Sequence, residues 1–160
     1  MSGNIHTTSV LLPPNGLDQI IASFGDIYSY IQPDHSLDAR WQAEALDLIS
    51  LPFPLPLSWD KSQSVIKLRC HKLMGSIFTG VFSKIQSAGL QDRLTSFGGC
   101  FSFRPQRIAI DLNPETNQQG SIGNMDPAII AIFRDAGFQW GGTWQGKSRD
   151  PMHFQFCTGY

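Results

Sequence analysis

Two stretches decide the fold of this chain, Ile108-Ala-Ile-Asp-Leu-Asn-Pro114 and Met152-His-Phe-Gln-Phe156. In both, polar and apolar side chains fall on opposite sides when successive residues are assigned to alternate faces, which is typical of strands that bury one face. A third strand is predicted from Cys100 to Arg104. Three short strands combined with helical segments predict an α+β fold with a small antiparallel sheet.

Two helices are expected to cover this sheet. Apolar residues recur at helical spacing from Ser62 to Ala88, which predicts a long core helix that ends at Gly89. A second, shorter helix is predicted after Asp126, a suitable N-cap residue that is followed by proline. Gly137 marks its expected end.

Residues 1–60 are interrupted by proline and glycine, with short amphipathic segments at Leu17 to Phe24 and around Trp41 to Ile49. We expect them to form an irregular N-terminal arm with short helices packed on the core. Residues 61–160 would form the core itself, so the chain would be one globular unit. A length of 160 residues with 41% hydrophobic content agrees with one domain.

Composition argues against several classes of partner. The net charge is -1 and the pI is about 6.4, so nucleic acid is not an expected partner. No apolar stretch approaches the roughly 20 residues that span a bilayer, and no signal peptide is recognised. We therefore expect synthesis in the cytoplasm, no membrane insertion, a monomer, and reduced thiols at the three widely spaced cysteines.

The polar faces of the three predicted strands are candidates for a site. If the apolar faces lie on the helices, Arg104, Asp111 and His153 project from the same side of the sheet. The ordinary alternative is a solvated sheet face, which also alternates polar and apolar residues. The loop Trp140-Gly-Gly-Thr-Trp144 comes shortly before the third strand and could wall off a cleft, although two core tryptophans around a turn would look the same.

Asp150 lies three residues before His153. In a continuous strand these two side chains would face opposite ways, so they can share a site only if Pro151 bends the chain between them. An Asp-Pro pair is also a common turn opener, and that interpretation is compatible with a role as general base.

Taken together, these motifs resemble the D-alanyl-D-alanine carboxypeptidase and L-alanyl-D-glutamate endopeptidase family of zinc peptidases, which includes phage endolysins. The stretches that carry the resemblance are Gly98 to Pro105, Ala109 to Asn117, Trp140 to Trp144 and Asp150 to Gln155.

The resemblance implies a function and a set of site residues. It implies a zinc metallopeptidase that acts on the peptides of bacterial peptidoglycan, as a carboxypeptidase or an endopeptidase of the endolysin type. Asp111 and His153 would bind zinc, and Asp150 would be the general base. Arg104 would steady the substrate or the developing oxyanion, and the substrate groove would include Ser102, Trp140 and Trp144. The target would be the bacterial cell wall and its stem peptides.

The sequence departs from the family at one position. In the family, a Ser-x-His-x-x-Gly stretch leads into the Ala-x-Asp motif and supplies the first zinc ligand, whereas here Arg107 is joined directly to Ile108. Only two of the usual three protein ligands are visible. His6, His35 and His71 remain as replacements. Activity would then be impaired, and the alternative is a catalytically dead peptidoglycan-binding protein or a phage structural protein that retains the peptidase fold.

Overall fold

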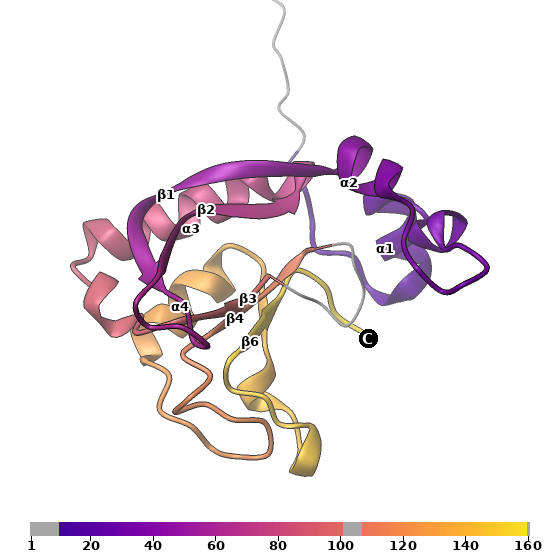
Figure 1. The fold of residues 1–160 in the computed structure, drawn as a ribbon. Coiled ribbons are helices and arrows are strands. Elements are labelled where there is room, and N and C mark those ends of the chain that lie inside the picture. Colours follow the sequence, from indigo (N-terminus) through magenta and orange to yellow (C-terminus); the bar gives the residue numbers. More distant parts are fainter. Residues whose placement is uncertain (1–9, 101–106, 160) are drawn as a thin grey trace, which may run out of the picture.

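The computed structural model describes residues 10–100 and 107–159, which form an α+β fold with two small antiparallel sheets (Figure 1). The α-helices are α1 (Gly16–Phe24), α2 (Ala39–Ala45), α3 (Gly75–Ser87) and α4 (Pro127–Asp135). The strands are β1 (Leu46–Pro56), β2 (Ser64–His71), β3 (Phe97–Gly99), β4 (Ala109–Leu112), β5 (Gln139–Trp140) and β6 (His153–Gln155). Short 3₁₀ turns cover Ile27–Tyr30, Lys72–Met74, Gln91–Arg93, Gly141–Thr143 and Gly146–Ser148.

The predicted long helix from Ser62 to Ala88 is wrong in its first half. The helix α3 begins at Gly75, and the preceding residues form β2, which pairs antiparallel with β1. The stretch Ile66-Lys-Leu-Arg-Cys70 alternates apolar and basic residues, a period of two that fits a strand better than a helix. The segment can pair with β1 in this conformation, so it forms a strand although its apolar residues also fit helical spacing.

Strand β1 also replaces part of the expected irregular arm. It passes through Pro52, Pro54 and Pro56, residues that cannot donate a backbone hydrogen bond. The Leu57 N–H bonds to the Gln63 carbonyl, so the neighbouring Pro56 places its nitrogen on the outer edge of the sheet. Pro52 and Pro54 lie between Ser50 and Leu55, where the register of β1 with β2 shifts, so they fall at an irregularity of the ladder.

The second sheet has the strand order β3-β4-β6-β5 and contains two of the three predicted strands. Its apolar face lies on α4, where the rings of Phe133 and Phe154 stack with centroids 4.2 Å apart. The third predicted strand, Cys100 to Arg104, lies almost entirely outside the described residues, and β3 ends at Gly99. A parallel bridge from Leu57 to Phe97 connects the two sheets.

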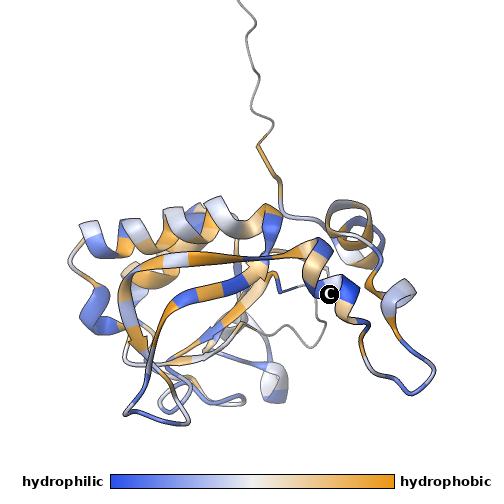
Figure 2. Cartoon of the chain, turned by 45° about the horizontal axis from the view of Figure 1, so that its top comes forward, coloured by the Kyte–Doolittle hydropathy of each residue, from blue (hydrophilic) through white to orange (hydrophobic). Residues whose placement is uncertain are grey.

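Helix α4 agrees with its prediction. The Asp126 carboxylate accepts a hydrogen bond from Ala128 N–H at 2.8 Å, and Pro127 occupies the first turn. Gly137, just beyond the helix, has φ 103°, a value that suits glycine. In Figure 2 the mixed polar and apolar colouring of the helices reflects their division into a buried and an exposed face.

The core is continuous and joins both sheets to α3 and α4. Its fully buried side chains include Phe78, Phe82, Phe133, Phe154 and Phe156. Helices α1 and α2 gather at one side of the molecule, near the start of β1 (Figure 1). The three cysteines are buried and free, as expected, and burial raises the pKa of the Cys157 thiol to about 11. Within the described part of the chain, no helix is long and apolar enough to cross a bilayer.

Candidate functional site

Asp111 and His153 face each other across the middle of the second sheet. They are direct cross-strand partners in the β4–β6 register, so their side chains leave the sheet on the same face. The His153 Nδ1 atom lies 2.9 Å from Asp111 Oδ1. The His153 side chain is 13% exposed and the Asp111 side chain is 23% exposed. The prediction that strand parity brings these two residues together is confirmed.

The His153 ring is held at both nitrogens. Its Nε2 atom lies 3.0 Å from Gln155 Oε1, while Nδ1 faces Asp111. Burial alone would lower the pKa of His153, but the hydrogen bond to Asp111 and its negative charge, together with Gln155 and Asp150, outweigh burial and raise that pKa. The His153 ring therefore remains an imidazolium to a higher pH than an ordinary histidine would.

Asp150 occupies a turn that leads directly into β6. Its backbone carbonyl accepts a hydrogen bond from His153 N–H at 3.1 Å, which closes the turn around Pro151. The bend that the sequence required between Asp150 and His153 is therefore present. Gly141 accepts from Asp150 N–H, and a Cβ at Gly141 would collide with the Asp150 carbonyl. The backbone of the Asp150 turn can therefore approach the loop this closely only because residue 141 is a glycine.

One oxygen of the Asp150 carboxyl group, Oδ1, has lost contact with water without gaining a hydrogen bond from the described residues. Burial raises the pKa of Asp150, the nearby Asp111 charge raises it further, and His153 lowers it in part. A carboxyl group with a raised pKa beside a second carboxylate and an imidazole is an arrangement suited to proton transfer.

The two predicted groove tryptophans lie next to this cluster. The Trp144 ring is tilted against the His153 ring with centroids 5.6 Å apart. Trp140 is half-buried and donates its indole N–H to the Pro151 carbonyl at 2.8 Å. Trp140 therefore braces the Asp150 turn, and Trp144 forms the side of the site next to the imidazole. Arg104 and Ser102 lie outside the described residues.

Asp111 and His153 have atoms of the kind that zinc binds, at nearly the right separation. Two tetrahedral ligands at about 2.0–2.1 Å from zinc lie roughly 3.3 Å apart, so the 2.9 Å pair of Asp111 and His153 needs only a small opening to hold the ion. A carboxylate oxygen and an imidazole nitrogen are suitable ligands. Within residues 10–100 and 107–159, however, no group of three such side chains is assembled. The described residues therefore offer two candidate ligands and do not complete a catalytic zinc site.

The candidate replacement His71 is not available in this fold. It lies at the end of β2, not in a helix, and is 2% exposed. Its Nε2–H donates to the Phe24 carbonyl at 2.8 Å, and its Nδ1 accepts from Leu73 N–H. Burial lowers the pKa of His71 and keeps the ring neutral. His35 lies in an exposed turn with φ 66°, and His6 is outside the described residues.

Two further residues of the site were not assigned a role from the sequence. Gln155 is 7% exposed and contacts His153, and Gln139 contacts Gln155 from β5. The parity of β6 places Gln155 on the face of His153, so this neighbour could have been inferred. Gln139 could not, because the pairing of β5 with β6 depends on the tertiary structure.

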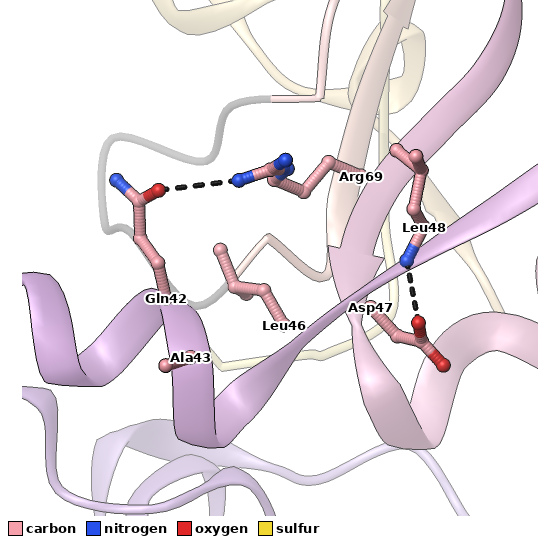
Figure 3. Close-up of a pocket in the computed structure, with 6 residues that line it drawn as sticks. All are labelled: Gln42, Ala43, Leu46, Asp47, Leu48 and Arg69. Atoms are coloured by element: carbon pink, nitrogen blue, oxygen red, sulfur yellow. Dashed lines mark hydrogen bonds between the residues drawn. The ribbon is translucent and has the colours of Figure 1, made fainter.

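A separate pocket of about 240 Å³ lies at the junction of α2, β1 and β2 (Figure 3). It is lined by Gln42, Ala43, Leu46, Asp47, Leu48 and Arg69. Arg69 donates to Gln42 Oε1 at 3.3 Å across its opening. None of the candidate site residues lines it.

Comparison with known proteins supports the same region. Residues 98–156 match the family model described as D-alanyl-D-alanine carboxypeptidase. The match covers less than half of the chain and includes Asp111, Asp150, His153 and the tryptophan loop. It supports a peptidase-type hydrolase at the level of that family. The chain matches no curated protein and no solved structure.

Proposed function

We propose that this protein is a zinc-dependent peptidase of bacterial cell-wall peptides, with a site built on Asp111, His153 and Asp150. The observation that carries the proposal is the cross-strand contact of Asp111 and His153 within a segment similar to carboxypeptidases. Zinc, when bound, polarises a peptide carbonyl and acidifies water. Asp111 and His153 are the proposed ligands, and a third ligand has to come from outside the described residues.

The other residues have proposed roles of their own. Asp150 is the general base, because its buried and unpartnered Oδ1 leaves a lone pair available to accept a proton. Trp144 and Trp140 form a wall that limits access of water next to His153. Arg104 and Ser102 are proposed to bind the substrate from the connection that precedes β4. Whether the enzyme acts as a carboxypeptidase or an endolysin-type endopeptidase depends on the groove.

A second candidate function is that of a peptidoglycan-binding protein or a phage structural protein that retains the peptidase fold without catalytic activity. The observation that favours it is the lack of a three-ligand group within the described part of the chain. A retained groove would still hold a stem peptide through the tryptophan loop.

The test begins with protein purified without chelator. We expect about one zinc per chain by mass spectrometry and release of peptides from purified peptidoglycan. Asp111→Asn should abolish both, whereas the exposed control Asp135→Asn should retain both. Protein without zinc and without peptide release would contradict the enzyme proposal. Calorimetry with a stem peptide then tests the binding module, which requires measurable heat at millimolar peptide.

A restoration experiment addresses the missing ligand. Arg107 has φ 54°, and its carbonyl accepts from His71 N–H at 3.1 Å, so the connection to β4 is held in a defined conformation. A Ser-x-His-x-x-Gly segment inserted between Arg107 and Ile108 should increase zinc affinity. The same insertion with alanine in place of histidine is the matched control. Equal zinc affinity in both insertions would contradict the assignment of Asp111 and His153 as ligands.

A further inference from the structure

Four polar side chains form a row across one face of the second sheet: Asp111, His153, Gln155 and Gln139. The β4–β6 register pairs Asp111 with His153, and the β5–β6 register pairs Gln139 with Gln155. His153 and Gln155 are two residues apart in β6 and so share a face. The row therefore links the proposed metal ligands to the far edge of the sheet.

The orientation of the Gln155 amide is fixed by its surroundings. Its Nε2 atom donates to the Cys157 carbonyl at 3.3 Å and to Gln139 Oε1 at 3.2 Å. A backbone carbonyl can only accept a hydrogen bond, so the NH₂ group must face Cys157. The Oε1 atom is consequently the one that faces His153 Nε2, at 3.0 Å.

An amide oxygen also only accepts, so His153 Nε2 must carry a hydrogen. Turning the ring by 180° would place carbon atoms against both Asp111 and Gln155 and would remove both contacts. Because Gln155 is 7% exposed, water cannot readily take the place of the lost partner. The buried amide thus selects one ring orientation.

We propose that Gln155 is the positioning residue of His153: its amide oxygen accepts from Nε2–H and holds the ring so that Nδ1 points toward Asp111, where a bound metal ion would take the place of the Nδ1 hydrogen. Gln139 supports it by accepting from the Gln155 amide. The relevance to metal rests on the proposed function, since a metal-binding histidine commonly donates its other ring N–H to such an acceptor. The ring orientation itself does not depend on any metal.

The first test uses metal-free protein with ¹⁵N-labelled histidine at pH 6. The exchange of the His153 Nε2 hydrogen with water is measured by NMR. Gln155→Met, which keeps the volume but loses the acceptor, should speed that exchange about fivefold or more. Gln155→Glu keeps an acceptor oxygen for Nε2 but loses the NH₂ that donates to the Cys157 carbonyl, so it should speed the exchange less than Gln155→Met does. The exposed control Gln118→Met should not change it.

Gln139→Met removes only the support of Gln155 and should cause a smaller increase, which provides a readout if Gln155→Met folds poorly. Unchanged exchange in Gln155→Met, or an equal increase in Gln155→Glu, would overturn the proposal. A general loss of structure would instead speed the exchange of backbone amides throughout β4 and β6, and the same spectra monitor those amides.

The second test measures zinc affinity by competition with a chromophoric chelator. Gln155→Met should weaken zinc binding about 10- to 100-fold, and Gln155→Glu, which keeps the oxygen that faces Nε2, should weaken it less. Equal affinity in Gln155→Met and the original protein would overturn the positioning role. If the original protein binds no zinc, the ligand assignment of the proposed function fails, while the exchange measurement still decides the role of Gln155.

Discussion

The contact between Asp111 and His153 predicts a coupling energy that depends on pH. A hydrogen bond to a charged group contributes about 1.5–3 kcal/mol, and partial exposure of the two side chains screens some of it. We therefore expect a coupling of about 1.5 kcal/mol at pH 6 from a double-mutant cycle of Asp111→Ala and His153→Ala. The free energy of unfolding of the four proteins is measured in urea, with a chelator present to exclude metal.

The direction of the pH dependence follows from the raised pKa of His153. A raised pKa in the folded state means that the stabilisation is complete below the ordinary value of 6.5 and is lost as the pH rises through the folded value. At a pH above that folded value, located by NMR titration of His153, the ring is neutral, and the coupling should fall by about half because the charge–charge part is lost while a hydrogen bond remains. A coupling below about 0.5 kcal/mol at pH 6, or one that is equal at both pH values, would refute the reasoning.

Three further predictions concern stability and the shape of the site. Phe133→Ala removes a fully buried ring that stacks on β6 and should lower the free energy of unfolding by about 3–5 kcal/mol in urea titrations; a loss below about 1 kcal/mol would show that this core is loosely packed. Asp126→Ala removes the N-cap of α4 and should cost about 1 kcal/mol by the same assay, and no loss would mean that the cap is dispensable. Gly141→Ala places a Cβ against the Asp150 carbonyl and should reduce both thermal stability and peptide release, whereas Gly80→Ala, on α3 with open space around it, should leave release unchanged; equal behaviour of the two variants would contradict the close approach.

Much of the candidate site could be predicted because strand parity is a local property. The alternation in Ile108 to Asn113 and Met152 to Phe156 assigned Asp111 and His153 to the polar face of their strands, and the confirmed strands β4 and β6 show this. Asp150 and His153 could share a site only if the chain bends at Pro151, and that bend is present as a hydrogen-bonded turn. Helix α4 could be predicted from local signals alone, because Asp126 and Pro127 mark its start and Gly137 marks its end.

Other features depended on partners far away in the chain. The segment from Ser64 to His71 has apolar residues that suit either a helix or a strand, and its pairing with β1 decides between them. The proline-containing segment could become a strand because Pro52 and Pro54 lie where the register with β2 shifts, and only the sheet reveals that irregularity.

The sequence by itself determined which face of each strand carries the acidic and imidazole groups, because alternation along a strand is fixed by backbone geometry. Only the tertiary structure decided that Asp111 lies directly opposite His153, that Gln139 reaches Gln155, and that the Asp150 carboxyl oxygen is buried without a partner among the described residues. The physical reason is that register, burial and electrostatic environment come from residues brought together by folding, and the order of residues along the chain does not specify those distances.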